Sequence, residues 1–162
     1  MADAPPVHDA AELTYYIETR YHARHRVQLA SLIEMAEKVE MVHFGDEDVP
    51  DGLSELLRRM TGEMEVHMKK EELILFPAIR NGGASGIENP IAVMRADHDD
   101  HVRAVAQINH LTGNLTLPTG ACGTWTRLYD GLIEFVADLT EHMRLENDVL
   151  FPQFETRNHA NA

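Results

Sequence analysis

The sequence has a single cysteine, Cys122, among its 162 residues. No internal disulfide can form and no cluster of thiolates can hold a metal, so we expect a reducing, cytoplasmic setting. No apolar run approaches the roughly 18 residues that a membrane-spanning helix needs. The N-terminus has neither the basic start nor the apolar stretch of a signal peptide. These absences predict a cytoplasmic protein that does not enter a membrane.

Basic residues are also scarce. Lys and Arg number 14 against 27 Asp and Glu, which gives a formal net charge of −13. A nucleic-acid-binding face or a surface for anionic lipid needs clustered positive charge, so we predict neither kind of partner. Histidine is the residue in excess, with ten copies, and four of them form two HxxH pairs.

Apolar residues recur at helical spacing in four segments, which are separated by loops rich in glycine, proline and acidic residues. The segments cover about residues 10–43, 53–78, 91–111 and 125–152, and we expect a Phe-Pro pair to close the second and the fourth. Long helices joined by short loops favour an all-α, antiparallel up-down-up-down four-helix bundle. We expect the bundle to span residues 10–154, between a disordered N-terminal tail at 1–9 and a C-terminal tail at 155–162.

Two stretches repeat one pattern, HMKKEELILFP from His67 and HMRLENDVLFP from His142, 75 positions later. Each has a His, a Glu four residues on, an apolar run and Phe-Pro. The HxxH pairs repeat at a similar offset, since YHARH contains His22 and DHDDH contains His98, 76 positions later. The sequence therefore predicts a duplicated helical hairpin and a bundle with pseudo-two-fold symmetry.

In each HxxxE the two side chains leave the same helix face, one turn apart. A surface ion pair would explain one such motif. The surrounding apolar residues place both copies on inward faces, where unpaired His and Glu are costly. A pair of metal ions in the middle of the bundle explains both copies together. The candidate ligands, one His from the first helix of each half and a His and a Glu from the second, are His22, His67, Glu71, His98, His142 and Glu146.

Bridging by the two glutamates would give each ion two imidazoles and two carboxylates. This ligand set without thiolate suits iron, our first choice, or manganese, our second. Nearby polar residues are candidates for orienting imidazoles, relaying protons or lining an access path. They are His25, His101, Glu63, Asp97, Glu18 and Asp138. Glu72 lies about 100° around the helix from Glu71 and is expected to face solvent.

The same residues resemble a known family. The stretches RYHARHR, AEKVEMVH, EVHMKKEELILFPAI, NPIAVMRADHDDH, ACGTWTRLYDG and HMRLENDVLFP are similar to hemerythrin-like di-iron proteins, and among them to the Repair of Iron Centres (YtfE/ScdA/DnrN) type. The resemblance covers about residues 15–152. It implies a hemerythrin-like bundle with two non-haem iron ions, an oxo or hydroxo bridge, the same six ligands, and bridging by Glu71 and Glu146. It also implies acidic groups near the centre at Glu63 and Asp97.

Two departures from related proteins qualify this resemblance. An oxygen-carrying hemerythrin typically has HxxxH where this chain has its second HxxxE, together with a short Asp ligand. Glu146 therefore argues against simple reversible oxygen carriage. Longer members of the repair family carry an N-terminal domain with paired cysteines. Here the bundle is expected to begin near residue 10, so chemistry that needs those thiols is absent or supplied by another protein.

The resemblance implies a cytoplasmic protein of nitrosative and oxidative stress defence, which helps repair iron–sulfur clusters by donating iron, by reacting with nitric oxide, or both. Two alternatives stay open. One is a di-iron enzyme that acts on nitric oxide, nitrite or peroxide, and the other is a protein that only binds or senses oxygen or nitric oxide. The implied partners are these small ligands, apo iron–sulfur proteins and an unidentified reductant. No catalytic residue is assigned, and whether the protein is an enzyme stays open.

Overall fold

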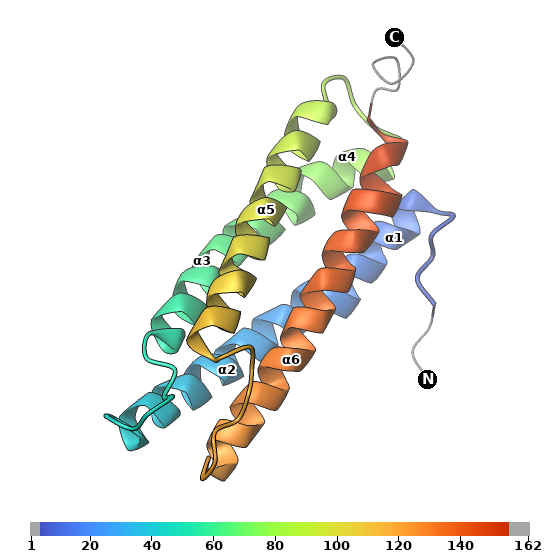
Figure 1. Ribbon diagram of the computed structural model, residues 1–162. Coiled ribbons are helices and arrows are strands. Elements are labelled where there is room, and N and C mark those ends of the chain that lie inside the picture. Colours follow the sequence, from blue (N-terminus) through green and yellow to red (C-terminus); the bar gives the residue numbers. More distant parts are fainter. Residues whose placement is uncertain (1–3, 156–162) are drawn as a thin grey trace.

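The computed structural model describes residues 4–155 of the chain. Residues 1–3 of the predicted N-terminal tail and 156–162 of the predicted C-terminal tail lie outside the described residues. Within the described part, all regular structure is helical and forms four long rods (Figure 1). The predicted antiparallel four-helix bundle is confirmed. Among the described residues, no helix combines the length and the apolar character needed to cross a membrane.

Three of the four rods contain a short segment of π-helix, which is wider than an α-helix. The first rod is α1 (Ala10–Ile17), η1 (Glu18–His22) and α2 (Ala23–Val42). The second is α3 (Leu53–Lys70), η2 (Glu71–Leu75) and α4 (Phe76–Arg80). The third is α5 (Glu88–Leu111). The fourth is α6 (Gly123–Arg144), η3 (Leu145–Leu150) and the 3₁₀ turn η4 (Phe151–Gln153).

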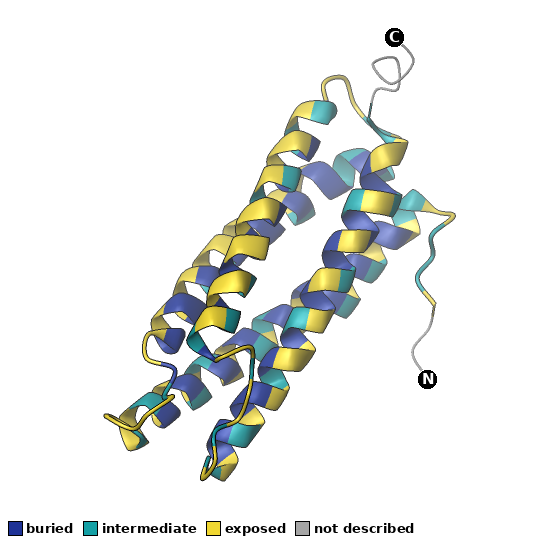
Figure 2. Ribbon diagram, viewed as in Figure 1, coloured by how far each residue is buried: buried dark blue, intermediate teal, exposed yellow. Residues whose placement is uncertain are grey.

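The core is divided into two apolar clusters along the length of the bundle. One cluster joins the inner faces of α2, α3 and α6 with the end of α5, where Leu32, Met60 and Phe135 are buried. The other joins α1, α4, the start of α5, η3 and η4, where Ile17 and Phe151 are buried. Buried residues face the inside of the bundle all along the rods (Figure 2). Between the two clusters lies a layer of buried His and Glu side chains.

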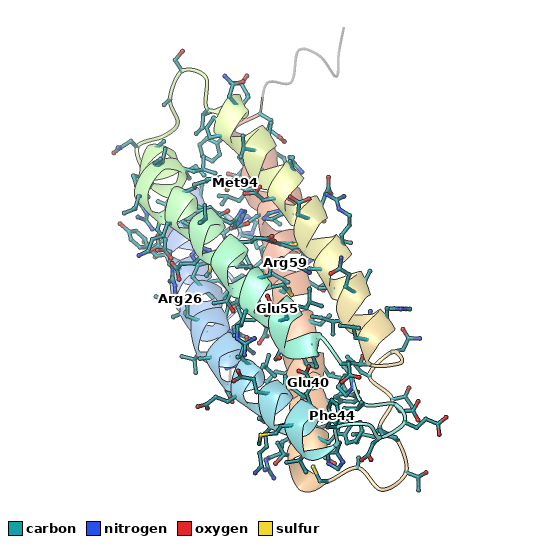
Figure 3. All side chains as sticks on the ribbon, turned by 90° about the vertical axis from the view of Figure 1, so that its left-hand side faces the viewer. Arg26, Glu40, Phe44, Glu55, Arg59 and Met94 are labelled. Carbon is teal, nitrogen blue, oxygen red and sulfur yellow. The ribbon has the colours of Figure 1, made fainter. Side chains whose placement is uncertain are left out.

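Side chains fix the ends of several helices. Asp9 accepts a hydrogen bond from the backbone N–H of Glu12 and so caps α1. Glu40, near the end of α2, accepts from the backbone N–H groups of Gly52 and Ser54, each at 2.9 Å. This carboxylate therefore ties the end of the first rod to the start of the second (Figure 3).

One predicted boundary is wrong. We expected Pro77 to close the second helix, but the rod continues through α4 to Arg80. A proline inside an α-helix lacks an N–H donor and its ring clashes with the preceding turn. Here the preceding turn is the wide segment η2, in which the N–H of Phe76 bonds to the carbonyl of Glu71, five residues back. The wider turn leaves room for the proline ring, so the helix continues.

Candidate metal centre

The six candidate ligands, which stand far apart in the sequence, meet in the polar layer between the two apolar clusters. None of them is more than 2% exposed. Their nitrogen and oxygen atoms form two quartets, and within each quartet the atoms lie within 4.8 Å of one another. The quartets are His22, Glu71, His142 and Glu146, and His67, Glu71, His98 and Glu146. Both glutamates belong to both quartets.

Each glutamate presents one oxygen to each quartet. In Glu71, Oε1 lies 3.0 Å from Nε2 of His22, whereas Oε2 lies 3.5 Å from Nε2 of His67. In Glu146, Oε2 lies 3.1 Å from Nε2 of His142, whereas Oε1 lies 2.9 Å from Nε2 of His98. A carboxylate in this position can bind two cations at once, one through each oxygen.

The wide helical turns coincide with the site. His22, Glu71 and Glu146 each lie in a π segment. Such segments are rare and occur often at functional sites, because the wider turn changes the direction of the side chains that follow. Pro77 and Pro152 stand six residues after the two glutamates. The repeated Phe-Pro of the sequence thus accompanies the wide turn that carries each bridging candidate.

Four buried atoms of the second quartet make no well-aligned hydrogen bond among the described residues, although they lie in two pairs only 2.9 and 3.5 Å apart. They are Nε2 of His67, Nε2 of His98, Oε2 of Glu71 and Oε1 of Glu146. Unpaired buried polar atoms are rare, because each one loses its hydration without replacement. Two imidazole nitrogens and two carboxylate oxygens that converge in this way are a donor set for a transition-metal cation. These four atoms by themselves indicate that the residues suit a metal ion.

Each candidate imidazole is also held from outside through its other nitrogen. The Nδ1 of His22 donates to Glu72 at 2.8 Å, and that of His67 donates to Asp97 at 3.0 Å. Such bonds fix the ring orientation and leave Nε2 free to ligate a metal.

The other two imidazoles have neutral outer partners. The Nδ1 of His98 donates to the amide oxygen of Asn147 at 2.8 Å, and that of His142 donates to Nε2 of His25 at 3.0 Å. His25 in turn donates to Gln28, whose amide donates to Asp138. Hydrogen bonds thus link the centre to the carboxylate of Asp138.

The pKa values of the two buried carboxyls, Glu71 and Glu146, are shifted in opposite directions. Burial, together with the charge of Glu146, raises the pKa of Glu71 well above its usual range. Burial also tends to raise the pKa of Glu146. The neighbouring His142 and His98 outweigh this effect and hold its pKa well below the usual value. Two cations between the carboxylates would remove this repulsion and allow both groups to be ionised.

Only some of the further candidate residues contact the proposed ligands. Asp97 and His25 contact candidate ligands directly, as described above. His101 lies beside His67, with 5.0 Å between ring centroids. Glu63 lines a cavity next to Asp97. Glu18 pairs with Arg80 rather than with His22.

Two predictions from spacing need correction or extension. Glu72 does not simply face solvent, because it accepts from His22 and also from Arg26, which lies on the facing side of α2 (Figure 3). The first rod packs so closely against the second that the residue beside the bridging Glu71 can also contact a candidate ligand. Asn147 was missed, although it follows Glu146 as Glu72 follows Glu71. This matched offset was the signal that would have found it.

A four-helix bundle that buries two His₂Glu₂ quartets around shared carboxylates defines a cation-binding bundle protein. Comparison with known families agrees. The chain belongs to the hemerythrin HHE cation binding domain family, which matches residues 13–154. The predicted hemerythrin-like resemblance is confirmed.

Curated relatives narrow the comparison further. The chain is 49% identical over 142 residues to the iron-sulfur cluster repair protein YtfE of Edwardsiella ictaluri, and 47% identical over 143 residues to that of Escherichia coli O157:H7. The protein of the same name from Pectobacterium carotovorum is 48% identical over 143 residues. The matches cover 88% of this chain and 64–65% of the relatives. The similarity therefore concerns less than two thirds of the length of each relative.

Proposed function

We propose that the chain binds two non-haem iron ions in the polar layer and serves the repair of iron–sulfur clusters, by donating iron and by reacting with nitric oxide. The observation that carries the proposal is the orientation of Glu71 and Glu146, each with one oxygen toward each quartet. The names of the curated relatives support the repair role. The single cysteine, which rules out an internal disulfide, supports a reducing, cytoplasmic setting.

The proposed ligands divide between the two ions. His22 and His142 would hold one ion, His67 and His98 the other, and the glutamates would bridge them, with an oxo or hydroxo group alongside. Imidazole and carboxylate donors suit iron first and manganese second. When bound, the ions supply the redox chemistry that nitric oxide or oxygen requires.

The chain's own residues prepare this site in three ways. The hydrogen bonds at the Nδ1 atoms hold each imidazole with its Nε2 toward the centre. The two apolar clusters keep bulk water from the ligands, whose side chains are almost fully buried. Four protein groups per ion are fewer than the six positions of an octahedral ion, so positions stay available for a small ligand or for exchange of the ion.

An enzyme that acts on nitric oxide, nitrite or peroxide is the second candidate. A cavity of about 570 Å³ favours it, because this cavity is lined by Asp97, the partner of His67, and by His101. Pockets of this size typically hold small substrates. Pure binding or sensing of oxygen or nitric oxide is the third candidate, and the experiment below separates all three.

The first measurement is the metal content of protein purified without chelator, together with an absorption spectrum in the region of oxo-bridged ferric bands. We expect two iron ions per chain, and loss of both in a Glu71→Ala/Glu146→Ala double variant. Glu141→Ala, which removes a surface pair with Arg144, is the matched control and keeps its iron. Unchanged iron stoichiometry in the double variant would contradict the proposed site.

The second measurement separates the roles. The reduced protein is mixed without oxygen with an apo iron–sulfur acceptor, or with nitric oxide and a chemical reductant. Cluster formation that depends on the loaded protein supports iron donation. Nitrous oxide over many turnovers supports the enzyme, and a stable nitrosyl adduct without iron transfer supports the binder. Iron that stays in the protein in the presence of both nitric oxide and acceptor contradicts the repair role.

A further inference from the structure

An apolar stripe lies on the outer face of the second rod, along α3 and η2. Its large apolar side chains are those of Val66, Leu73 and Ile74, which are 56%, 70% and 64% exposed. Together with Lys69 and Lys70 they line an open groove of about 330 Å³. These five residues form the α3/η2 face. Contiguous exposed apolar groups beside charged residues are typical of surfaces that bind another molecule.

The internal repeat shows that the fold does not require apolar residues on this face. The offset of 75 positions aligns Val66 with Glu141. It also aligns Leu73 with Asp148, which is exposed to solvent. Both halves form the same kind of helical hairpin, but the second half has charged residues at these positions. Folding therefore does not explain the apolar residues of the first half.

The α3/η2 face is positively charged, although the chain carries a formal net charge of −13. It contains Lys69 and Lys70, two of only three lysines in the sequence. Glu65, which also lines the groove, is engaged through both of its oxygens by Arg26 of α2 (Figure 3). Glu72 also accepts from Arg26, and it lies 3.9 Å from Nζ of Lys69. Lys70 has no ion pair among the residues that the structure describes.

These charges argue against a membrane or a second copy of the chain as the occupant. Recruitment to anionic lipid takes clusters of about four to eight basic residues, and this face has two lysines. A two-fold dimer interface uses the same patch on both copies, and so would bring the lysines of both copies together. Charges more than about 8 Å away are largely screened at physiological ionic strength, so the local lysines act on a partner more than the net charge does. The face therefore suits a protein with apolar side chains flanked by carboxylates.

The α3/η2 face lies on the outside of the rod that carries two of the proposed ligands. Val66 directly precedes His67, and Lys70 directly precedes Glu71. Val66 and Lys70 are exposed, whereas the two ligands are buried. A protein docked on this face is therefore separated from the polar layer by about 10 Å, the diameter of one helix.

We propose that the α3/η2 face is the docking surface for the protein that receives the iron, and that this acceptor presents apolar side chains flanked by carboxylates. The acceptor's identity as an iron–sulfur protein rests on the proposed function. The apolar groove supplies binding energy, and the two lysines steer the acidic partner and fix its orientation. Iron passes as Fe²⁺ without transfer of an electron, and cysteine thiolates of the acceptor replace the His and Glu ligands.

Binding of an apo-ferredoxin of negative net charge to the reduced, iron-loaded chain tests the surface, measured without oxygen by biolayer interferometry. We expect Leu73→Ser/Ile74→Ser to raise the Kd at least about tenfold, because a few central apolar anchors carry most of the affinity of an interface. Lys69→Glu/Lys70→Glu should raise the Kd by about the same factor. In that variant added salt should no longer weaken binding, because the attraction that salt screens has been removed.

Two variants away from the face are the controls. Lys38→Glu reverses the charge of the third lysine, and Ile133→Ser removes an apolar side chain that is 52% exposed on α6. Both should keep the Kd within about twofold of the wild-type value. All four variants change exposed residues, so their iron content and melting temperature should match the wild type. Wild-type protein that does not bind the apo-ferredoxin, or equal affinities in the double variants and the controls, would overturn the docking surface.

Other occupants of the face give different results. Concentration-dependent dimers of the wild type that disappear in Leu73→Ser/Ile74→Ser, followed by analytical ultracentrifugation, would assign the face to a second copy of the chain. Binding to vesicles of phosphatidylcholine and phosphatidylserine that disappears in the same variant would assign it to a membrane. Either result overturns the proposal of an acidic protein partner.

The docking surface and the proposed function fail in different ways. Cluster formation on the apo-ferredoxin, with sulfide supplied, measures iron transfer. Transfer at the wild-type rate in both double variants overturns the docking surface and leaves iron donation intact. Binding that depends on the α3/η2 face, without transfer of iron from the wild type, overturns iron donation and leaves a docking surface for an acidic protein.

Discussion

Each quartet contains one imidazole held by a carboxylate and one held by a neutral group. His22 and His67 donate to Glu72 and Asp97, respectively. The partners of His142 and His98 are a neutral imidazole and an amide oxygen. A carboxylate partner makes an imidazole a stronger donor to a metal. The two ions would therefore receive similar electron density, although the partners come from different positions of the repeat.

At the scale of single residues, the first prediction concerns the support that Glu72 gives to His22. Glu72→Ala leaves the Nδ1 of His22 without its acceptor, and we expect iron affinity to fall about 10- to 100-fold. Glu65→Ala is the control, because it removes another partner of Arg26 and leaves the bond between His22 and Glu72 in place. Competition with a coloured chelator measures both affinities. Equal losses in the two variants would show that the charge near Arg26, and not the support of His22, matters.

A second residue-scale prediction concerns pH. Burial and the neighbouring imidazoles lower the pKa of His25 and of His101 to about 3. In the unfolded chain these groups take up a proton near pH 6.5, so the unfolded state binds more protons below that value. The metal-free protein should therefore lose stability as pH falls from about 6.5 toward 3. Urea unfolding at pH 7.5 and 5 measures this, and His101→Gln should show a smaller loss.

The six proposed ligands could be found from the sequence because the repeat marks them twice. Their outer partners could only be found in part. Asp97 and His25 stand next to or one turn from a ligand, and both were candidates. Glu72 and Asn147 also stand next to a ligand but were not predicted as outer partners. All four partners act across to a neighbouring rod, and which side of a helix faces that rod depends on packing that spacing does not fix.

At the scale of elements, helical periodicity located all four rods but not their wide turns. Periodicity averages over several turns, and a single π segment shifts the pattern by only one residue. The segments at Glu71 and Glu146 explain why a Phe-Pro can follow within the same rod. The segment at His22 has no proline after it, and nothing in the sequence predicts it.

At the scale of elements, the prediction concerns Gly62 in α3 and Gly131 in α6, two glycines in the middle of helices. Gly62→Ala should raise the free energy of unfolding by about 0.5–1 kcal/mol, because alanine favours the helix and meets no neighbour. Gly131→Leu should lower it by about 1–3 kcal/mol, because the added side chain overlaps Leu32 where α2 and α6 approach closely. Urea unfolding of the metal-free variants measures both. A stabilised Gly131→Leu variant would show that α2 and α6 are not held this close.

At the scale of the whole molecule, a layer of buried polar groups separates two apolar clusters. This layer contributes little to the stability of the metal-free chain, since its carboxylates repel each other and several of its atoms lack partners. The helical pattern implied a buried apolar core, but not its division into two clusters, because that division follows from the depth at which the ligands meet.

Removal of the metal should therefore destabilise the bundle as a whole. A ligand that binds only the folded state at 100 to 1,000 times its Kd stabilises it by about 3–4 kcal/mol. For a chain of this size, this corresponds to a melting temperature about 5–15 °C higher with iron than without it. Thermal unfolding followed by circular dichroism, before and after reduction and chelation, measures the shift. The Glu71→Ala/Glu146→Ala variant should melt at one temperature under both conditions.

The composition of the quartets has a consequence for the origin of the chain. His22 of the first half shares its quartet with His142 of the second, and His67 shares its quartet with His98. A single ancestral hairpin would have offered incomplete ligand sets, and only two copies related by a two-fold axis would have completed both. The present chain has the form of such a homodimer joined by gene fusion. In one chain the two copies need not be identical, and Asp97 stands where the first half has Tyr21.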